Sequence, residues 1–151
     1  MSQTNQFDWL ERWDLEQVSV RTLHCKKWKE YELDIEKHIL LNYSTKLLRQ
    51  TGIDISFLFS LSVLTYEGEK KEDPAEILEE DRTFTIELEI DIVYYKELAE
   101  TIPEAELLEI GSQIVAPDAW AYARELLSNM TVRMGYRPLL LPPYQKVVYG
   151  G

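Results

Sequence analysis

Few residues in the sequence combine the side-chain type and the spacing that catalysis or metal binding requires. The two histidines, His24 and His38, fall on different predicted strands and face opposite ways relative to the apolar pattern, and no H-x-x-x-H or C-x-x-C pair is present. Cys25 precedes Lys26 and Lys27, whose charges would favour a thiolate, but a lone cysteine at a strand end is usually unreactive. We therefore predict no catalytic residue, no metal and no cofactor.

Acidic side chains alternate along one predicted strand at Glu87, Glu89 and Asp91. Their spacing would suit paired acid–base chemistry, so an enzyme that uses this strand face is one alternative. A solvated strand face explains the same pattern and is the interpretation we favour. The sequence contains no G-x-x-x-x-G-K-[ST], G-x-G-x-x-G or G-x-S-x-G motif. We therefore expect a non-enzymatic protein that works without ATP.

The composition predicts one soluble, acidic domain that spans residues 1–151, with residues 1–13 as a flexible or short extension. Of the 151 residues 45% are hydrophobic, which is enough to bury a core. The 27 acidic and 16 basic residues give a net charge of −11, which argues against nucleic acid and anionic membranes as partners. A single cysteine, a polar amino terminus and the lack of an apolar run of about 20 residues indicate a cytoplasmic protein.

The apolar pattern has a period of two in the first part of the chain and a helical period afterwards. Alternating side chains predict strands over 14–24, 33–43, 55–66 and 83–92, with a turn at 50–54. Lys37 interrupts the apolar face of the second strand, where a bulge or an oligomer edge would fit. Half of the residues from 67 to 82 are Asp or Glu, which predicts a solvated hairpin loop with one helical turn after Pro74.

Capping signals and an apolar stripe predict two helices in the second part of the chain. Thr101 and Glu104 have capping-box spacing, and Gly111 is a plausible end for the first helix. Pro117 opens the second helix, which ends at Gly135 and carries the stripe Ala119, Tyr122, Ala123, Leu126, Leu127, Met130 and Met134. The proline-rich segment 138–144 is predicted to be extended. Strands followed by helices indicate an α+β fold with a four-stranded, mostly antiparallel sheet.

The chain has more aromatic side chains than this sheet and two helices would cover: four Trp, nine Tyr and four Phe. Trp28 and Tyr31 fall in the connection between the first two predicted strands, and Tyr94 and Tyr95 lie beyond the fourth. Surplus apolar surface on an acidic protein indicates contacts with other chains, either an oligomer interface or a groove for an extended peptide.

One predicted helix and the segment after it resemble a known family. The segment 121–130, AYARELLSNM, resembles the "YARE…S.M" helix of the SecB export chaperones, and LLLPP at 139–143 follows like that family's "L.LPP" segment. Trp28 resembles the family's Trp in the crossover before strand two, and the segment 84–88 can be laid on its fourth strand. The order of elements matches over residues 14–145, so the sequence resembles a SecB-like chaperone over nearly its whole length.

The resemblance implies a four-stranded antiparallel sheet with a Greek-key-like crossover and helices packed on one face. It also implies an ATP-independent holdase that forms dimers or tetramers and binds non-native polypeptide in apolar grooves. Glu87, with Glu89 on the same face, matches the acidic face that meets the export motor in export members. Taken with the surplus aromatic residues, the resemblance predicts the client-binding residues Trp28, Tyr31, Phe84, Ile86, Leu88, Tyr94 and Tyr95. The predicted oligomer interface comprises Phe84, Ile86, Leu88 and Tyr122.

Two departures from the family bear on the partner. The chain ends at Gly151 without the longer carboxy-terminal helix and the basic, glycine-rich tail of export members, and Tyr144-Gln145-Lys146 replaces the usual Val-Asn-Phe. Delivery to the export motor is therefore doubtful. A dedicated chaperone of an antitoxin, in a toxin–antitoxin–chaperone system, is favoured over a general export chaperone. A non-catalytic oligomeric scaffold is a further alternative.

Overall fold

The computed structural model describes residues 13–30, 32, 35–96, 102–142 and 144. Within these ranges, four long strands form one antiparallel sheet in the order β1–β4–β3–β2, and two α-helices joined by a π-helical turn follow the last strand. Two short 3-10 turns, η2 and η3, lie between β3 and β4. The bounds are β1 Trp13–Lys27, β2 His38–Gln50, β3 Asp54–Tyr66, η2 Pro74–Glu76, η3 Glu79–Asp81, β4 Arg82–Lys96, α1 Glu104–Ile110, η4 Gly111–Val115 (the π turn) and α2 Ala116–Arg133.

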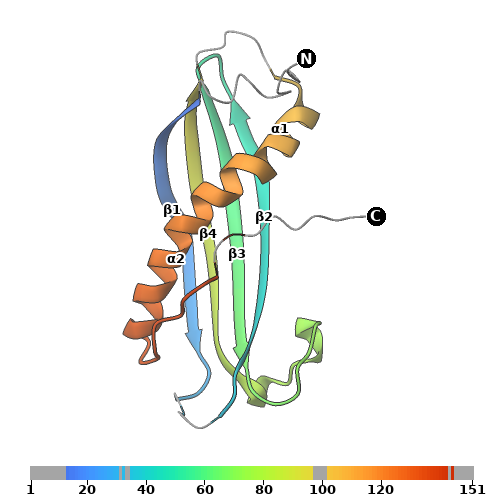
Figure 1. The fold of residues 1–151 in the computed structure, drawn as a ribbon, viewed down its shortest axis with the longest axis vertical. Coiled ribbons are helices and arrows are strands. Elements are labelled where there is room, and N and C mark those ends of the chain that lie inside the picture. The colour runs from blue at the N-terminus through green and yellow to red at the C-terminus, as the bar shows by residue number, and fades with distance from the viewer. Residues whose placement is uncertain (1–12, 31, 33–34, 97–101, 143, 145–151) are drawn as a thin grey trace, which may run out of the picture.

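The strands have a Greek-key arrangement. β2, β3 and β4 follow one another as antiparallel neighbours, whereas β1 lies on the far side of β4, so the β1–β2 connection crosses the end of the sheet (Figure 1). The predicted α+β fold, with four antiparallel strands, a Greek-key-like crossover and helices on one face, is confirmed.

The predicted start of the second strand at residue 33 is wrong, because β2 begins only at His38. Residues 33 and 34 lie outside the described ranges, but the turn that precedes the strand is visible. Lys37 donates from Nζ to the backbone carbonyls of Glu32, at 2.6 Å, and Ile35, at 3.3 Å. The lysine that breaks the alternating pattern therefore belongs to a turn and not to a bulge.

One face of the sheet, the inner face, carries the hydrophobic core. Both helices lie over this face, as Figure 1 shows. Alternate residues of the two central strands point toward the helices, and the buried ones are Ile55, Phe57, Phe59, Leu61 and Val63 of β3 and Phe84, Ile86, Leu88, Ile90, Ile92 and Tyr94 of β4. At roughly 25 cal/mol per Å² of apolar area removed from water, this double layer is the main source of stability.

α1 ends at Ile110, next to the predicted end at Gly111, but the chain continues through the π turn into α2, so the two helices and this turn form one continuous rod. Among the described glycines only Gly68 and Gly135 have a positive φ, which leaves the backbone at Gly111 free to continue as helix. Gly135, with φ of 91°, ends the rod as predicted, because a left-handed residue after the last turn is available to glycine at little cost.

The apolar stripe of α2 is confirmed in part. Ala119, Ala123 and Leu127 are fully buried against the sheet, and their small or compact side chains let the helix approach closely. Tyr122 is 36% exposed, and the neighbouring Trp120 is buried instead. The helix is therefore rotated slightly from the orientation that the stripe predicted.

The segment after α2, which we call the C-terminal strap (residues 138–142 and 144), returns over the inner face without helix or strand (Figure 1). Leu141 is buried in the core, and Trp120 donates from Nε1 to the carbonyl of Pro142 at 2.7 Å. The ring of Tyr144 meets the ring of Tyr43 edge-on, at 6.0 Å between centroids. The strap thus covers apolar surface of β2 and β3 that the helices leave open.

Side-chain hydrogen bonds connect the segment before α1 to the sheet. Gln50, at the end of β2, donates from Nε2 to the carbonyl of Ile102 at 3.1 Å and accepts from the amide of Ile102 at 2.9 Å. The buried Lys96 donates from Nζ to the same Gln50 oxygen at 2.5 Å. Burial lowers the pKa of Lys96, because an ammonium group loses hydration inside the fold.

The acidic hairpin between β3 and β4 folds back onto the other face of the sheet, the outer face. Ile77 of the hairpin packs there against Leu40, Leu64 and Tyr66, which form a second, smaller apolar cluster. The Tyr66 hydroxyl donates to the carbonyl of Lys71 and accepts from its amide, at 2.9 and 2.8 Å. The helical turn predicted in this loop is η2. No helix of the described residues is long and apolar enough to cross a membrane.

Candidate functional site

Four of the predicted client-binding residues lie in the core. Phe84, Ile86, Leu88 and Tyr94 are at most 5% exposed, because the rod of helices and the C-terminal strap cover the inner face of β4. Alternation identified correctly which face of the strand is apolar, but it could not reveal that this chain covers that face itself. In the folded single chain these side chains are not exposed to a client or a second chain.

The remaining predicted residues lie apart from one another. Tyr95 is 40% exposed near the end of β4, and Tyr122 faces solvent on α2. Glu87 and Glu89 are on the outer face, which no described helix covers. Trp28 lies at the opposite end of the sheet from Tyr95, beside the start of β4. Tyr31 lies outside the described residues.

Trp28 follows β1 directly and is held at the start of the crossover by backbone hydrogen bonds. The amides of Trp28 and Lys29 both donate to the carbonyl of Thr83, at 2.9 and 3.3 Å. The Lys29 ammonium group also forms an ion pair with Glu67, at 3.1 Å between Nζ and Oε2. These contacts fix the position at which the chain leaves the sheet.

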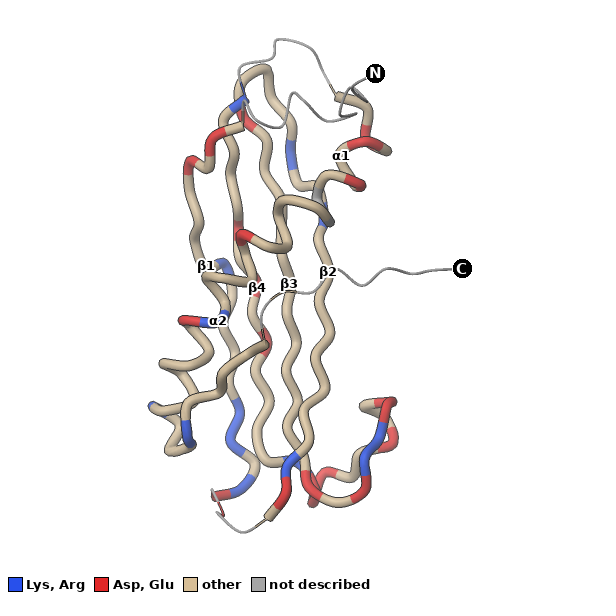
Figure 2. The backbone as a smooth tube through the Cα atoms, in the orientation of Figure 1, with Lys and Arg blue, Asp and Glu red and all other residues tan. Residues whose placement is uncertain are grey.

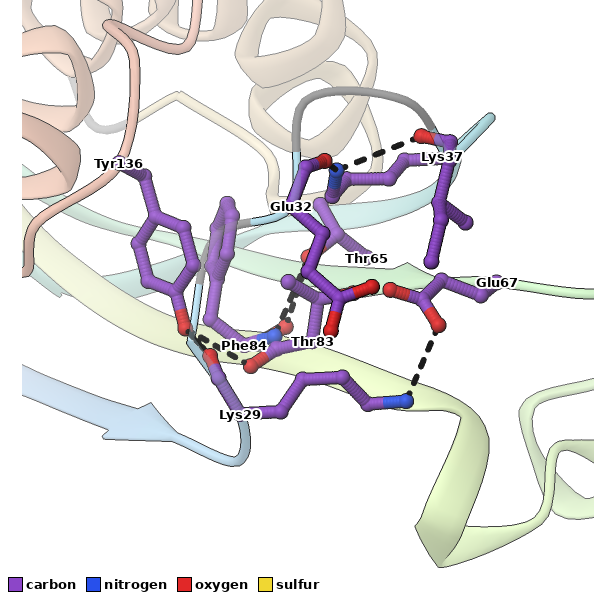
Figure 3. Close-up of polar contacts among 9 residues, drawn as sticks. Lys29, Glu32, Lys37, Thr65, Glu67, Thr83, Phe84 and Tyr136 are labelled. Atoms are coloured by element: carbon purple, nitrogen blue, oxygen red, sulfur yellow. Dashed lines mark hydrogen bonds and ion pairs between the residues drawn. The ribbon is translucent and has the colours of Figure 1, made fainter.

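Tyr136, from the turn after α2, anchors the same point from the inner side. Figure 3 shows its hydroxyl between two backbone carbonyls: it donates to Lys29, and to Thr83 at 3.1 Å. Its ring stacks on Phe84 at 4.8 Å between centroids. Burial, with a smaller effect from the Glu30 charge, raises the pKa of Tyr136 to about 12, so the phenol remains a donor at neutral pH. Nothing in the sequence pattern predicted this anchor.

A hollow of about 550 Å³ opens on the outer face next to Trp28, and we call it the Trp28 pocket. Its floor is the sheet itself and one wall is the acidic hairpin. The lining residues are His24, Lys26, Trp28, Leu40, Leu41, Asn42, Ser62, Val63, Leu64, Glu72, Pro74, Arg82, Thr85 and Glu87. A pocket of this size can hold one or two side chains of a peptide.

The indole ring of Trp28 is held in place by its neighbours on the outer face. Its Nε1 donates to the hydroxyl of Thr85 at 3.3 Å. The Lys26 ammonium nitrogen lies 3.7 Å from the ring centroid, and the Arg82 guanidinium carbon lies 5.4 Å from it. Cations close to an indole ring are attracted by its π electrons, and Trp is the strongest partner for such contacts.

The side chains that line the pocket are apolar on the β2–β3 side and basic on the β1 side. Leu40 and Leu64 are directly paired on β2 and β3 and give an apolar side. Lys26, on β1, gives a basic side. His24 and Glu87 are cross-strand partners in the adjoining row. Among the described residues, no group of three His, Cys, Asp or Glu side chains is placed to hold a metal ion.

Sequence reasoning named Trp28 as a client-binding residue, which stays a prediction, and it did not predict the pocket around this side chain. The pocket exists because the hairpin folds onto the outer face, and Ile77 holds it there within the second apolar cluster. An apolar pair, Ile77 and Leu78, inside an otherwise acidic loop was the available signal, since a fully solvated loop has no need of it. Leu78 is exposed in the folded chain.

The sheet order, the crossover and the rod of helices on one face are the fold of SecB-like chaperones. The Mycobacterium tuberculosis SecB-like chaperone Rv1957, solved in complex with a ChAD peptide from the Rv1956 HigA1 antitoxin, superposes with a TM-score of 0.74 over 90% of this chain and 93% of its own. The two sequences are 14% identical, so the likeness establishes the fold.

A protein of unknown function from Streptococcus agalactiae aligns over 86% of this chain and 96% of its own, with a TM-score of 0.48 and 13% identity. No protein-family model and no curated protein matches the sequence. The TM-score of 0.74 with Rv1957 confirms the SecB-like fold that the sequence resemblance implied.

Proposed function

We propose that this protein is an ATP-independent holdase chaperone that binds non-native polypeptide, and that its client is an antitoxin of a toxin–antitoxin–chaperone system. The observation that carries the proposal is the shared fold with a SecB-like chaperone that was solved with an antitoxin peptide bound. A chaperone with one client needs a defined contact site, and the Trp28 pocket is the site that we assign to this role.

Two features of the outer face and the sheet edges suit an extended client. The Trp28 pocket offers indole and leucine surface, where burial is worth about 25 cal/mol per Å² of apolar area. β1 and β2 each have only one strand neighbour among the described residues, so their free edges can hydrogen-bond to the backbone of an added strand. Backbone pairing tolerates many sequences, and the pocket adds preference for a bulky side chain.

We also propose that the protein is a cytoplasmic homo-oligomer. Val20 of β1 and Tyr122 and Val132 of α2 are exposed apolar residues in the described chain, and an interface between copies would cover them. The net charge of −11 disfavours nucleic acid as a partner and keeps the assembly soluble.

The proposal is tested by capture of the tagged protein from its native host, followed by native mass spectrometry of the intact complexes. We expect one dominant small partner, an antitoxin, at fixed stoichiometry. The Trp28→Ala variant should lose this partner, and Leu108→Ala, which removes an exposed leucine of α1 far from the pocket, should retain it.

Two other results of the capture experiment would each replace the proposed client. A broad set of precursor chains would favour a general export chaperone over a dedicated one. An oligomer that carries no polypeptide at all, with the wild-type protein as well as the variants, would contradict the chaperone role and favour a scaffold.

A further inference from the structure

The Trp28 pocket contains basic groups that its own fold does not pair with acids. No ion pair or hydrogen bond is formed by the side chains of Lys26 or Arg82 in the described chain, apart from their contacts with the Trp28 ring. Arg82 is only partly exposed, and its Nε atom is buried without a hydrogen-bond partner among the described residues. In a chain of net charge −11, these two cations at the edge of the pocket are available to an anionic group.

We propose that the basic side of the Trp28 pocket binds a carboxylate of the client, the side chain of an Asp or Glu that accompanies a bulky apolar residue. This inference rests on the proposed function, because it concerns the polypeptide that the pocket would hold. It adds a preference in the client sequence, an acidic residue at a set distance from an apolar one.

The contacts with Trp28 leave the two cations able to bind an anion. A guanidinium group that lies over a ring uses its flat face, and its N–H donors remain in the plane of the group. Arg82 lines the pocket, and no acid of the described chain pairs with its guanidinium group. A carboxylate supplies two acceptor oxygens and makes charge-assisted hydrogen bonds, so it is the ligand that suits such a guanidinium group best.

The register of the sheet sets the distance between the two halves of the ligand. Leu40, Leu64, Thr85 and Lys26 are consecutive cross-strand partners and form one row across β2, β3, β4 and β1. With neighbouring strands about 4.8 Å apart, the apolar side of the row lies roughly 12 Å from Lys26. In an extended segment that crosses the strands, residues four positions apart are separated by about 13 Å and point the same way.

Two acids also line the pocket, and their positions restrict where the carboxylate binds. Glu87 lies in the adjoining row, opposite His24, and Glu72 is exposed on the hairpin wall. Both repel an anion from their own parts of the pocket. Among the described residues that line the pocket, Lys26 and Arg82, next to Trp28, are the cations that attract a client carboxylate.

The test uses short fluorescein-labelled peptides in which a leucine is followed four positions later by Glu or by Gln, with small polar residues elsewhere. Fluorescence anisotropy should show that the wild-type protein binds the Glu peptide roughly tenfold more tightly than the Gln peptide, the effect of one charge-assisted contact. The Arg82→Gln variant should bind both peptides equally. Lys46→Gln, which removes an exposed lysine on β2 outside the pocket, should retain the preference.

The outcomes separate this inference from the proposed function. Equal binding of the two peptides by the wild-type protein, or a preference that survives in Arg82→Gln, would overturn the carboxylate site and leave a peptide-binding chaperone standing. If neither peptide binds to any variant, the assignment of the pocket to polypeptide fails, and the carboxylate site fails with it. Circular dichroism melting of each variant shows whether a loss of binding reflects a loss of folding.

Discussion

At the scale of single residues, the geometry of the site depends on one phenol. Tyr136 is remote in sequence from Lys29 and Thr83, yet its hydroxyl contacts the backbone of both and places the crossover against the start of β4. The same carbonyl of Thr83 accepts from the amide of Trp28. On the inner face, Tyr136 holds the backbone next to the indole. On the outer face, Thr85 accepts a hydrogen bond from the indole Nε1.

Replacement of Tyr136 by Phe should loosen the crossover. The variant retains the ring that stacks on Phe84 but leaves the carbonyl of Lys29 without its donor, which should cost about 1–2 kcal/mol of unfolding free energy in urea. Hydrogen exchange at the amides of Trp28 and Lys29 should become faster. Tyr95→Phe, which removes a hydroxyl from an exposed ring, is the matched control and should change neither quantity. Unchanged exchange in Tyr136→Phe would show that the anchor is dispensable.

At the scale of elements, the strap and the helical rod divide the inner face between them. Leu141 is 1% exposed and Leu140 is 76% exposed, so successive leucines of one segment point in opposite directions. Trp120 links the rod to the strap through Pro142. The proline-rich sequence keeps the strap extended, and successive side chains of an extended segment point in opposite directions. Every second side chain can therefore pack on the core.

The two leucines give a direct test of the strap. Leu141→Ala should destabilise the protein by about 2–4 kcal/mol, because it removes a fully buried side chain and leaves a cavity. Leu140→Ala should change stability by less than about 0.5 kcal/mol, since its side chain is in water. Urea unfolding followed by circular dichroism measures both. Equal, small effects would mean that the strap does not pack on the sheet in solution.

Local patterns in the sequence predicted the elements well and their ends less well. The alternation in 83–92 and the left-handed Gly135 were sufficient for β4 and for the end of α2, because each depends on neighbouring residues only. α1 ends at Ile110, before Gly111, but the chain continues as a π turn into α2, since a glycine can continue helical backbone when the following residues pack on the sheet. Propensity at one position is overridden by such tertiary contacts.

The assignment of Trp28 to client binding stays a prediction, and the pocket around Trp28 was not predicted. An apolar strand face can be covered by the same chain or left for a partner, depending on where the helices and the strap pack. The periodicity of the sequence does not tell where they pack. Phe84, Ile86 and Leu88 are core for this reason. The pocket depends on contacts between the hairpin and the outer face, such as Ile77 with Leu64. The apolar pair Ile77 and Leu78 signals that the loop packs on something, but it does not say on which surface.

At the scale of the whole molecule, the two faces of the sheet differ in what covers them. The inner face is filled by the rod and the strap and stabilises the fold. Charged residues gather at the crossover end of the molecule (Figure 2). The outer face carries the hairpin and the Trp28 pocket. A client bound there would add to a folded protein without opening its core, which suits a chaperone that works without ATP.

The most direct test of the central claim is aggregation of a chemically unfolded test protein, followed by light scattering after dilution into buffer without nucleotide. We predict that the wild-type protein suppresses scattering at near-equimolar concentration, that Trp28→Ala loses most of this activity, and that Leu108→Ala retains it. Suppression by Trp28→Ala equal to that of the wild-type protein would contradict the site, and scattering unaffected by the wild-type protein would contradict the chaperone function itself.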